Sequence, residues 1–166
     1  NIGKVMIGNE GTISLVLTSL LAGGPILLED MPGTGKTVMA KALAKSIQGE
    51  FRRIQFTPDL LPSDVTGLNY FDAKEGAFVF SKGPVFCNVL LADEINRATP
   101  KTQSSLLECM AEGQATVDGV TRPLSAPFLV IATKNPLDTL RTFPLPEAPL
   151  DRFLMRISME GLDPGQ

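Results

Sequence analysis

A glycine-rich stretch near the start of the chain has the residue types of a phosphate-binding loop. The stretch EDMPGTGKT, residues 29–37, matches the end of the pattern G-x-x-x-x-G-K-[ST], although Asp30 stands where the first glycine is expected. Backbone N–H groups of such a loop surround a phosphate, while Lys36 supplies a positive charge and Thr37 a hydroxyl for Mg²⁺. Asp tolerates turn geometry, so the replacement removes no phosphate contact. The alternative is a glycine-rich turn between a strand and a helix with an incidental Lys-Thr pair.

Two adjacent acids follow a strongly apolar run, NVLLADE, over residues 88–94. Such a run predicts a strand buried on both faces, with Asp93 and Glu94 at its end. Beside a phosphate loop in the same sheet, Asp93 can hold Mg²⁺ through water and Glu94 can polarise an attacking water. Taken alone, two acids in this position are commonplace and are usually solvated residues at the end of a strand.

The composition excludes several other kinds of chemistry. The 166 residues include no histidine and two cysteines, Cys87 and Cys109, so a zinc site would lack ligands and Ser-His or Cys-His catalysis is excluded. We expect the cysteines to be buried thiols, although a disulfide is possible. The net charge of −3 argues against a dedicated nucleic-acid binder. The sequence contains no apolar run of about 18 residues, so we expect no membrane span.

The pattern around these residues predicts alternating strands and helices. Apolar spacing predicts helices over residues 10–22, 38–47 and 100–112, and a short helix before a final strand. Strands are predicted over residues 25–29, 52–57, 88–94 and 127–133, with a proline-bearing connection after the second of them. Residues 68–86 are expected to form a hairpin or small insertion, and Asp118-Gly119 predicts the turn of another hairpin. The fold class is therefore α/β, a parallel, doubly wound sheet with an inserted hairpin.

Several separated motifs occur in the order found in AAA+ ATPases, and the chain resembles the MoxR family in particular. The motifs are LLEDMPGTGKT, LLADEINRATPKTQSSLLECMAEG, IATKNP and FPLPEAPLDRF, which together extend over most of the chain. In MoxR-like proteins the first glycine of the loop is often replaced, in agreement with Asp30. The resemblance implies a P-loop NTPase fold of AAA+ type, a parallel sheet of five strands flanked by helices, with inserted hairpins. It also implies that residues 1–166 are the nucleotide-binding α/β core, without the C-terminal helical lid.

The resemblance assigns roles to individual residues by their positions in these motifs. Asn135 matches sensor 1, which positions the attacking water, although it also suits a turn before Pro136. Arg152 matches the arginine finger that reaches a neighbouring subunit's nucleotide; the alternatives are a salt bridge to Asp151 or Glu147, and Arg97 as the trans-acting arginine. The catalytic set is then Glu94, Asn135, Arg152 and Lys36. The nucleotide-binding set is Pro32, Gly33, Thr34, Gly35, Lys36, Thr37, Val38, Ile7 and Gly8, and the metal ligands are Thr37 and Asp93.

The same resemblance implies a function for the whole assembly. It implies ATP and Mg²⁺ as cofactors, ATP hydrolysis, a homo-oligomeric ring of six subunits and a cytoplasmic location. The ring would remodel protein partners in a chaperone-like manner, von Willebrand factor A domain proteins among them. Residues 76–86 and 115–124 resemble hairpins that face the central pore of related machines, with ordinary surface β structure as the alternative. A DNA-directed AAA+ motor and a non-hydrolysing nucleotide-binding scaffold are the competing functions. Without a lid, the chain alone is expected to bind ATP weakly and to assemble poorly.

Overall fold

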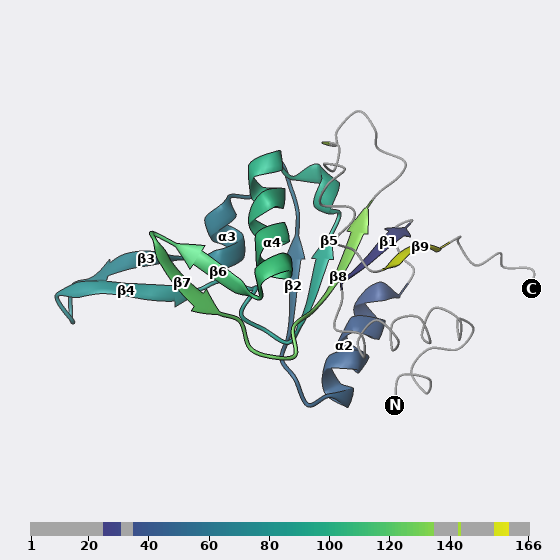
Figure 1. The fold of residues 1–166 in the computed structure, drawn as a ribbon, viewed down its shortest axis with the longest axis horizontal. Helices are drawn as coiled ribbons and strands as arrows, with labels where there is room; N and C mark the ends of the chain where they lie inside the picture. Colours follow the sequence, from purple (N-terminus) through teal and green to yellow (C-terminus); the bar gives the residue numbers. More distant parts are fainter. Residues whose placement is uncertain (1–24, 31–34, 135–142, 144–154, 160–166) are drawn as a thin grey trace, which may run out of the picture.

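The fold is an α/β arrangement in a computed structural model that describes residues 25–30, 35–134, 143 and 155–159 (Figure 1). The helix predicted over residues 10–22 and the short helix before the final strand lie outside these residues. The described elements are β1 (Ile26–Asp30), α2 (Lys36–Ser46), β2 (Phe51–Gln55), α3 (Pro62–Thr66), β3 (Gly67–Asp72), β4 (Ala77–Lys82), β5 (Val89–Asp93), the 3₁₀ turn η2 (Ile95–Arg97), α4 (Pro100–Glu112), β6 (Gln114–Val117), β7 (Val120–Pro123), β8 (Leu129–Lys134) and β9 (Met155–Met159).

Among the described residues, five strands form the central sheet, in the order β2-β5-β8-β1-β9. Every neighbouring pair is parallel, which confirms the predicted parallel sheet and its five strands. Strands β1 and β2 are neighbours in sequence but lie apart in the sheet, because β5 and β8 are inserted between them. Since the strands are parallel, their carboxyl ends lie along one edge, and that edge is where ligands bind in open α/β sheets.

The sheet is buried on both faces by alternating side chains. Successive residues of a strand point to opposite faces, and the buried residues divide in this way into two clusters. One cluster packs against α2 and includes Val89, Leu91 and Ile131. The other includes Leu90 and Ala132 and packs with residues of α4. The two-sided burial of β5, all five of whose residues are buried, confirms the strand predicted from its apolar run.

The boundaries of α4 agree with the predicted start and stop signals, whereas α2 begins at Lys36, two residues before the predicted start at residue 38. In α4, Pro100 is in the first turn and Gly113 follows the helix in the left-handed conformation, at φ 64°, which a residue without a Cβ adopts readily. The structure adds a helix that the sequence did not predict, α3, in the connection described above as proline-bearing. It is only five residues long, too short for apolar spacing to reveal it. Its start is stabilised by Asp64, whose carboxylate accepts a hydrogen bond of 2.8 Å from the Leu61 N–H.

Two antiparallel hairpins lie on the side of the sheet where β2 is the outer strand (Figure 1). The first, β3–β4, is the insertion predicted within residues 68–86, and the second, β6–β7, turns at Asp118-Gly119 as predicted. The hairpins contact each other. The side-chain amide of Asn69 donates a 2.8 Å hydrogen bond to Asp118, and the guanidinium of Arg122 lies 3.7 Å from the centre of the Phe80 ring. They therefore form one joined projection.

Both cysteines are buried and free, which confirms the prediction of buried thiols over the alternative of a disulfide. Burial raises the pKa of each thiol to about 12, so neither is a reactive thiolate at neutral pH. No helix among the described residues is long and apolar enough to cross a membrane.

We predict that Gly83→Ala destabilises the root of the β3–β4 hairpin. The chain leaves the core at Gly67 and returns at Gly83, and a Cβ on Gly83 would overlap backbone atoms of Val65 and Gly67. Backbone cannot move aside as a side chain can, so the cost should be about 1–3 kcal/mol in the free energy of unfolding, the usual range for overpacking. Denaturant unfolding measures it. Gly76→Asn at the hairpin tip is the control, since nothing lies within 4 Å of a Cβ there and Asn tolerates a positive φ. Equal stability of the two variants would contradict the close approach.

Candidate functional site

The candidate site lies at the carboxyl edge of the sheet, where α2 begins. Gly35 precedes α2 with φ 77° and ψ 13°, a left-handed conformation that glycine adopts without a steric penalty. This turn makes Lys36 and Thr37 the first two residues of the helix. Their position places the N–H groups of the first helical turn at the edge of the sheet, where they favour an anion.

Lys36 and Asp93 meet in an ion pair. The Lys36 Nζ lies 2.9 Å from Asp93 Oδ1, and the two side chains are 12% and 6% exposed. Burial alone would raise the pKa of Asp93, but hydrogen bonds from Thr133, Lys36 and Arg53, with the charge of Lys36, hold it below its ordinary value. Asp93 is therefore a carboxylate at neutral pH. The structure thus brings together the lysine of the predicted loop and the acid predicted to hold the metal.

Thr133, at the end of β8, links the two acids. Its hydroxyl donates a 2.7 Å hydrogen bond to Asp93 Oδ1 and accepts one of 2.8 Å from the backbone N–H of Glu94. Sequence reasoning did not select Thr133. The available signal was a hydroxyl residue at the end of an apolar strand, IAT, in a sheet whose neighbouring strand ends in acids.

Arg53, on β2, is a second cation on Asp93. Its Nη2 lies 2.7 Å from Asp93 Oδ2 and also donates a 2.7 Å hydrogen bond to the side-chain oxygen of Gln55. Gln55 pairs in register with Asp93, and its amide nitrogen lies 3.4 Å from Glu94 Oε2. Neither Arg53 nor Gln55 was selected from the sequence. Their signal was two polar residues, two positions apart, on one face of a strand.

Glu94 has a backbone conformation that is uncommon for a residue with a side chain. Its φ is 55° and its ψ 53°, in the left-handed region that is sparsely populated and found often at functional sites. The carboxylate contacts Arg97 as well as Gln55, with the Arg97 Nη1 3.3 Å from Oε2. Arg97, which the sequence offered as an alternative trans-acting arginine, is therefore paired with an acid of its own chain in this structure.

The chemistry of these donors fits Mg²⁺ better than a transition metal. Asp93 offers a carboxylate and Thr37 a hydroxyl, the hard oxygen ligands that Mg²⁺ prefers, and Mg²⁺ sites commonly use one or two carboxylates with waters and phosphate oxygens. Within the described ranges, no three His, Cys, Asp or Glu residues come close enough to form a metal cluster. A metal at this edge would therefore depend on a bound phosphate for further ligands.

Several predicted site residues lie outside the described part of the chain. These are Pro32, Gly33 and Thr34 of the loop, Ile7 and Gly8 at the expected adenine contact, Asn135 and Arg152. Their roles remain predictions. The next residue of the predicted binding set, Val38, is in the first turn of α2 and is 48% exposed.

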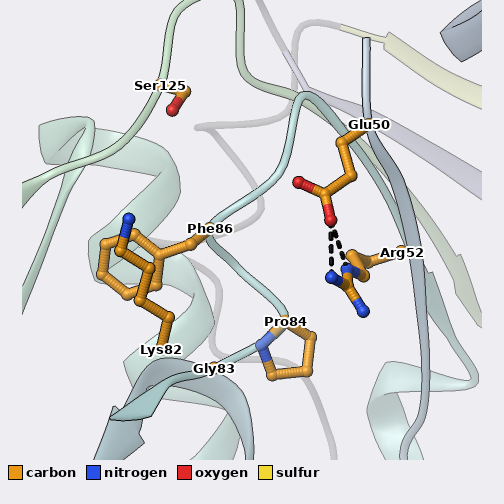
Figure 2. Close-up of a pocket in the computed structure, with 7 residues that line it drawn as sticks. All are labelled: Glu50, Arg52, Lys82, Gly83, Pro84, Phe86 and Ser125. Atoms are coloured by element: carbon orange, nitrogen blue, oxygen red, sulfur yellow. Dashed lines mark hydrogen bonds and ion pairs between the residues drawn. The ribbon is translucent and has the colours of Figure 1, made fainter. Parts of the chain in front are cut away.

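A separate hollow of about 310 Å³ lies away from this edge, between the start of β2 and the end of the β3–β4 hairpin. Figure 2 shows Glu50 paired with Arg52 on one side of it and Lys82 beside the ring of Phe86 on the other. None of the predicted site residues that the structure describes lines it. Because Glu50 precedes β2, the hollow lies toward the amino ends of the strands, and it is not the candidate site.

Comparisons with known proteins agree with this geometry. Residues 25–155 match the family described as "ATPase family associated with various cellular activities (AAA)". The chain is 57% identical to the protein YeaC of Bacillus subtilis over 159 residues, covering 96% of this chain and 50% of YeaC. It is 44% identical to the protein "Chaperone MoxR1" of Mycobacterium tuberculosis over 156 residues, covering 94% of this chain and 41% of the relative. A crystal structure of a Cytophaga hutchinsonii protein aligns with a TM-score of 0.88 and 50% identity, over 98% of this chain and 49% of that one. The chain spans about half the length of these relatives.

We predict that the Thr133 hydroxyl is required to hold the two acids together. Thr133→Val keeps the shape of the side chain but leaves the Glu94 N–H and one Asp93 oxygen short of a partner. The loss should be about 1–3 kcal/mol in the free energy of unfolding, the cost of leaving a buried polar group unsatisfied. Thr133→Ser is the matched control, because it retains the hydroxyl. The hydrogen-bonding role is wrong if chemical unfolding gives both variants the same stability.

Proposed function

The chain belongs to the MoxR family of AAA+ ATPases, and from this membership we propose that it binds ATP with Mg²⁺ and hydrolyses the bond to the terminal phosphate. The observation that carries the proposal is the ion pair between Lys36 and Asp93. It joins the start of the phosphate-loop helix to the acid at the tip of β5, at a distance of 2.9 Å. A lysine and a carboxylate so placed can exchange partners when a triphosphate and its metal arrive together.

Binding would proceed by that exchange. A phosphate brings several negative charges to the start of α2, so Lys36 leaves Asp93 and contacts the β- and γ-phosphates. Asp93, no longer neutralised by Lys36, would then hold Mg²⁺ through a water, and the Thr37 hydroxyl would be a direct ligand. The bound Mg²⁺ would supply positive charge at the β- and γ-phosphate oxygens. The N–H groups of Gly35 and the first turn of α2 would complete the phosphate contact.

Hydrolysis would require Glu94 to act on a water. Its carboxylate contacts Arg97 and Gln55, and both contacts are long, 3.3 and 3.4 Å, so they hold Glu94 only loosely. A carboxylate released from them can accept a proton from the attacking water. We assign Asn135 to the positioning of that water.

We further propose a cytoplasmic, hexameric ring in which Arg152 reaches the nucleotide of a neighbouring subunit. The ring would remodel protein partners, with von Willebrand factor A domain proteins as candidates. The support is the family membership and a relative named as a chaperone. The joined hairpins would present the exposed side chains of Phe71 and Phe78 to such a partner.

We predict that Glu94→Gln still binds ATP but hydrolyses it about 10²–10⁴-fold more slowly, the usual cost of removing a positioned general base. The amide has the shape of the carboxylate but cannot accept the proton. Phosphate release measures the rate, and a fluorescent ATP analogue measures binding. Glu112→Gln, at an exposed position on α4, is the control for loss of one negative charge. Wild-type turnover by Glu94→Gln would make Glu94 a structural residue.

We predict that Arg152→Ala, made in the full-length protein, binds ATP but assembles into rings that fail to hydrolyse it, since trans-acting arginines contribute about 10³–10⁵-fold in rate. Mixing this variant with Lys36→Ala should restore part of the activity, because an intact Lys36 site can then face an intact Arg152. Phosphate release by the mixed rings measures the rescue. A salt bridge within the chain predicts a lower melting temperature and no rescue, even where subunits are shown to exchange.

A further inference from the structure

Both carboxylate oxygens of Asp93 are occupied by groups of the protein. Oδ1 accepts from Thr133 and contacts Lys36, and Oδ2 contacts Arg53. The Arg53 contact, 2.7 Å, is shorter than the Lys36 contact, 2.9 Å. A phosphate can draw Lys36 away from Asp93. The partner exchange described above offers Arg53 no other anion, so it leaves Arg53 bound to Asp93. A divalent cation that approaches Asp93 therefore meets a guanidinium already bound to it.

The two cations differ in how easily they can leave Asp93. The Lys36 side chain is 12% exposed and begins α2, whereas the Arg53 side chain is 42% exposed. Arg53 also belongs to β2, which is an edge strand of the sheet. Its guanidinium can therefore turn toward solvent and return without moving the core. These are the properties of an exchangeable counter-ion.

We propose that Arg53 competes with Mg²⁺ for the carboxylate of Asp93, and so sets the Mg²⁺ concentration at which the site binds nucleotide. The inference rests on the proposed function, since it takes the metal and ATP to bind at this edge. Like charges repel at close range, so Mg²⁺ and the guanidinium cannot share Asp93 without loss. Arg53 acts through Asp93 and is a positioning residue, with no direct part in the chemistry.

The competition predicts two effects of opposite sign when Arg53 is removed. With Mg²⁺ present, the metal no longer competes with Arg53 for Asp93, so the site binds nucleotide at a lower Mg²⁺ concentration. Without Mg²⁺, removal of Arg53 leaves Asp93 with one cation instead of two. Asp93 then holds Lys36 more strongly and adds an uncompensated negative charge beside the phosphates. For both reasons ATP binds more weakly. A residue that only supports the fold would weaken binding in both conditions.

The test measures binding of a fluorescent ATP analogue to the full-length protein, as wild type and as Arg53→Gln, first in EDTA and then across a Mg²⁺ titration. For Arg53→Gln we expect the half-saturating Mg²⁺ concentration and the metal-free affinity each to fall about two- to fivefold, the range for a part-exposed ion pair. Arg52→Gln is the matched control. Arg52 is the preceding residue of β2 and is paired with Glu50, so the same charge is lost away from Asp93. We expect that control to leave both quantities unchanged.

The inference is overturned if Arg53→Gln needs as much Mg²⁺ as Arg52→Gln, or more, while melting at the wild-type temperature. Weaker binding in both conditions with a lowered melting temperature would make Arg53 a structural residue. Equal weakening in both conditions with an unchanged melting temperature would place Arg53 on the phosphates instead. Failure of the wild type itself to bind the analogue contradicts the proposed function, an outcome separate from any difference between the variants.

Discussion

A buried negative charge at the end of β5 is the constraint on which the site depends. A carboxylate removed from water is stable only when it is paired and hydrogen-bonded, and Asp93 is 6% exposed. Its partners come from three other elements: Lys36 from α2, Arg53 from β2 and Thr133 from β8. The need to satisfy one acid therefore fixes the start of a helix and the ends of three strands relative to one another.

The parallel sheet explains why these residues meet. Asp93 follows Val89 and Leu91 at alternate positions of β5, so it points to the face that α2 covers. Thr133 follows Leu129 and Ile131 in the same way, and Arg53 and Gln55 follow Phe51. Because the strands run in one direction, these polar ends lie at one edge, next to the first residue of α2. The apolar parts of the same strands form the core beneath the site.

The sequence predicted those parts of the site that lie within one continuous motif. Lys36 and Thr37 could be named because they end a glycine-rich loop, and Asp93 and Glu94 because they end an apolar run. Arg53, Gln55 and Thr133 could not, since their roles depend on which strands are neighbours and in which register. That register places Gln55 beside Asp93, and no spacing along the chain reveals it. A different limit applies to α3, whose five residues are too few to show a helical period.

The central claim is that Lys36 exchanges Asp93 for a phosphate when nucleotide binds. The most direct measurement is a structure of the protein with Mg²⁺ and a non-hydrolysable ATP analogue. The account predicts that the Lys36 Nζ lies within hydrogen-bond distance of a phosphate oxygen and no longer contacts Asp93, whose carboxylate then faces the metal. Lys36 still bound to Asp93, with the phosphates held elsewhere, would contradict it.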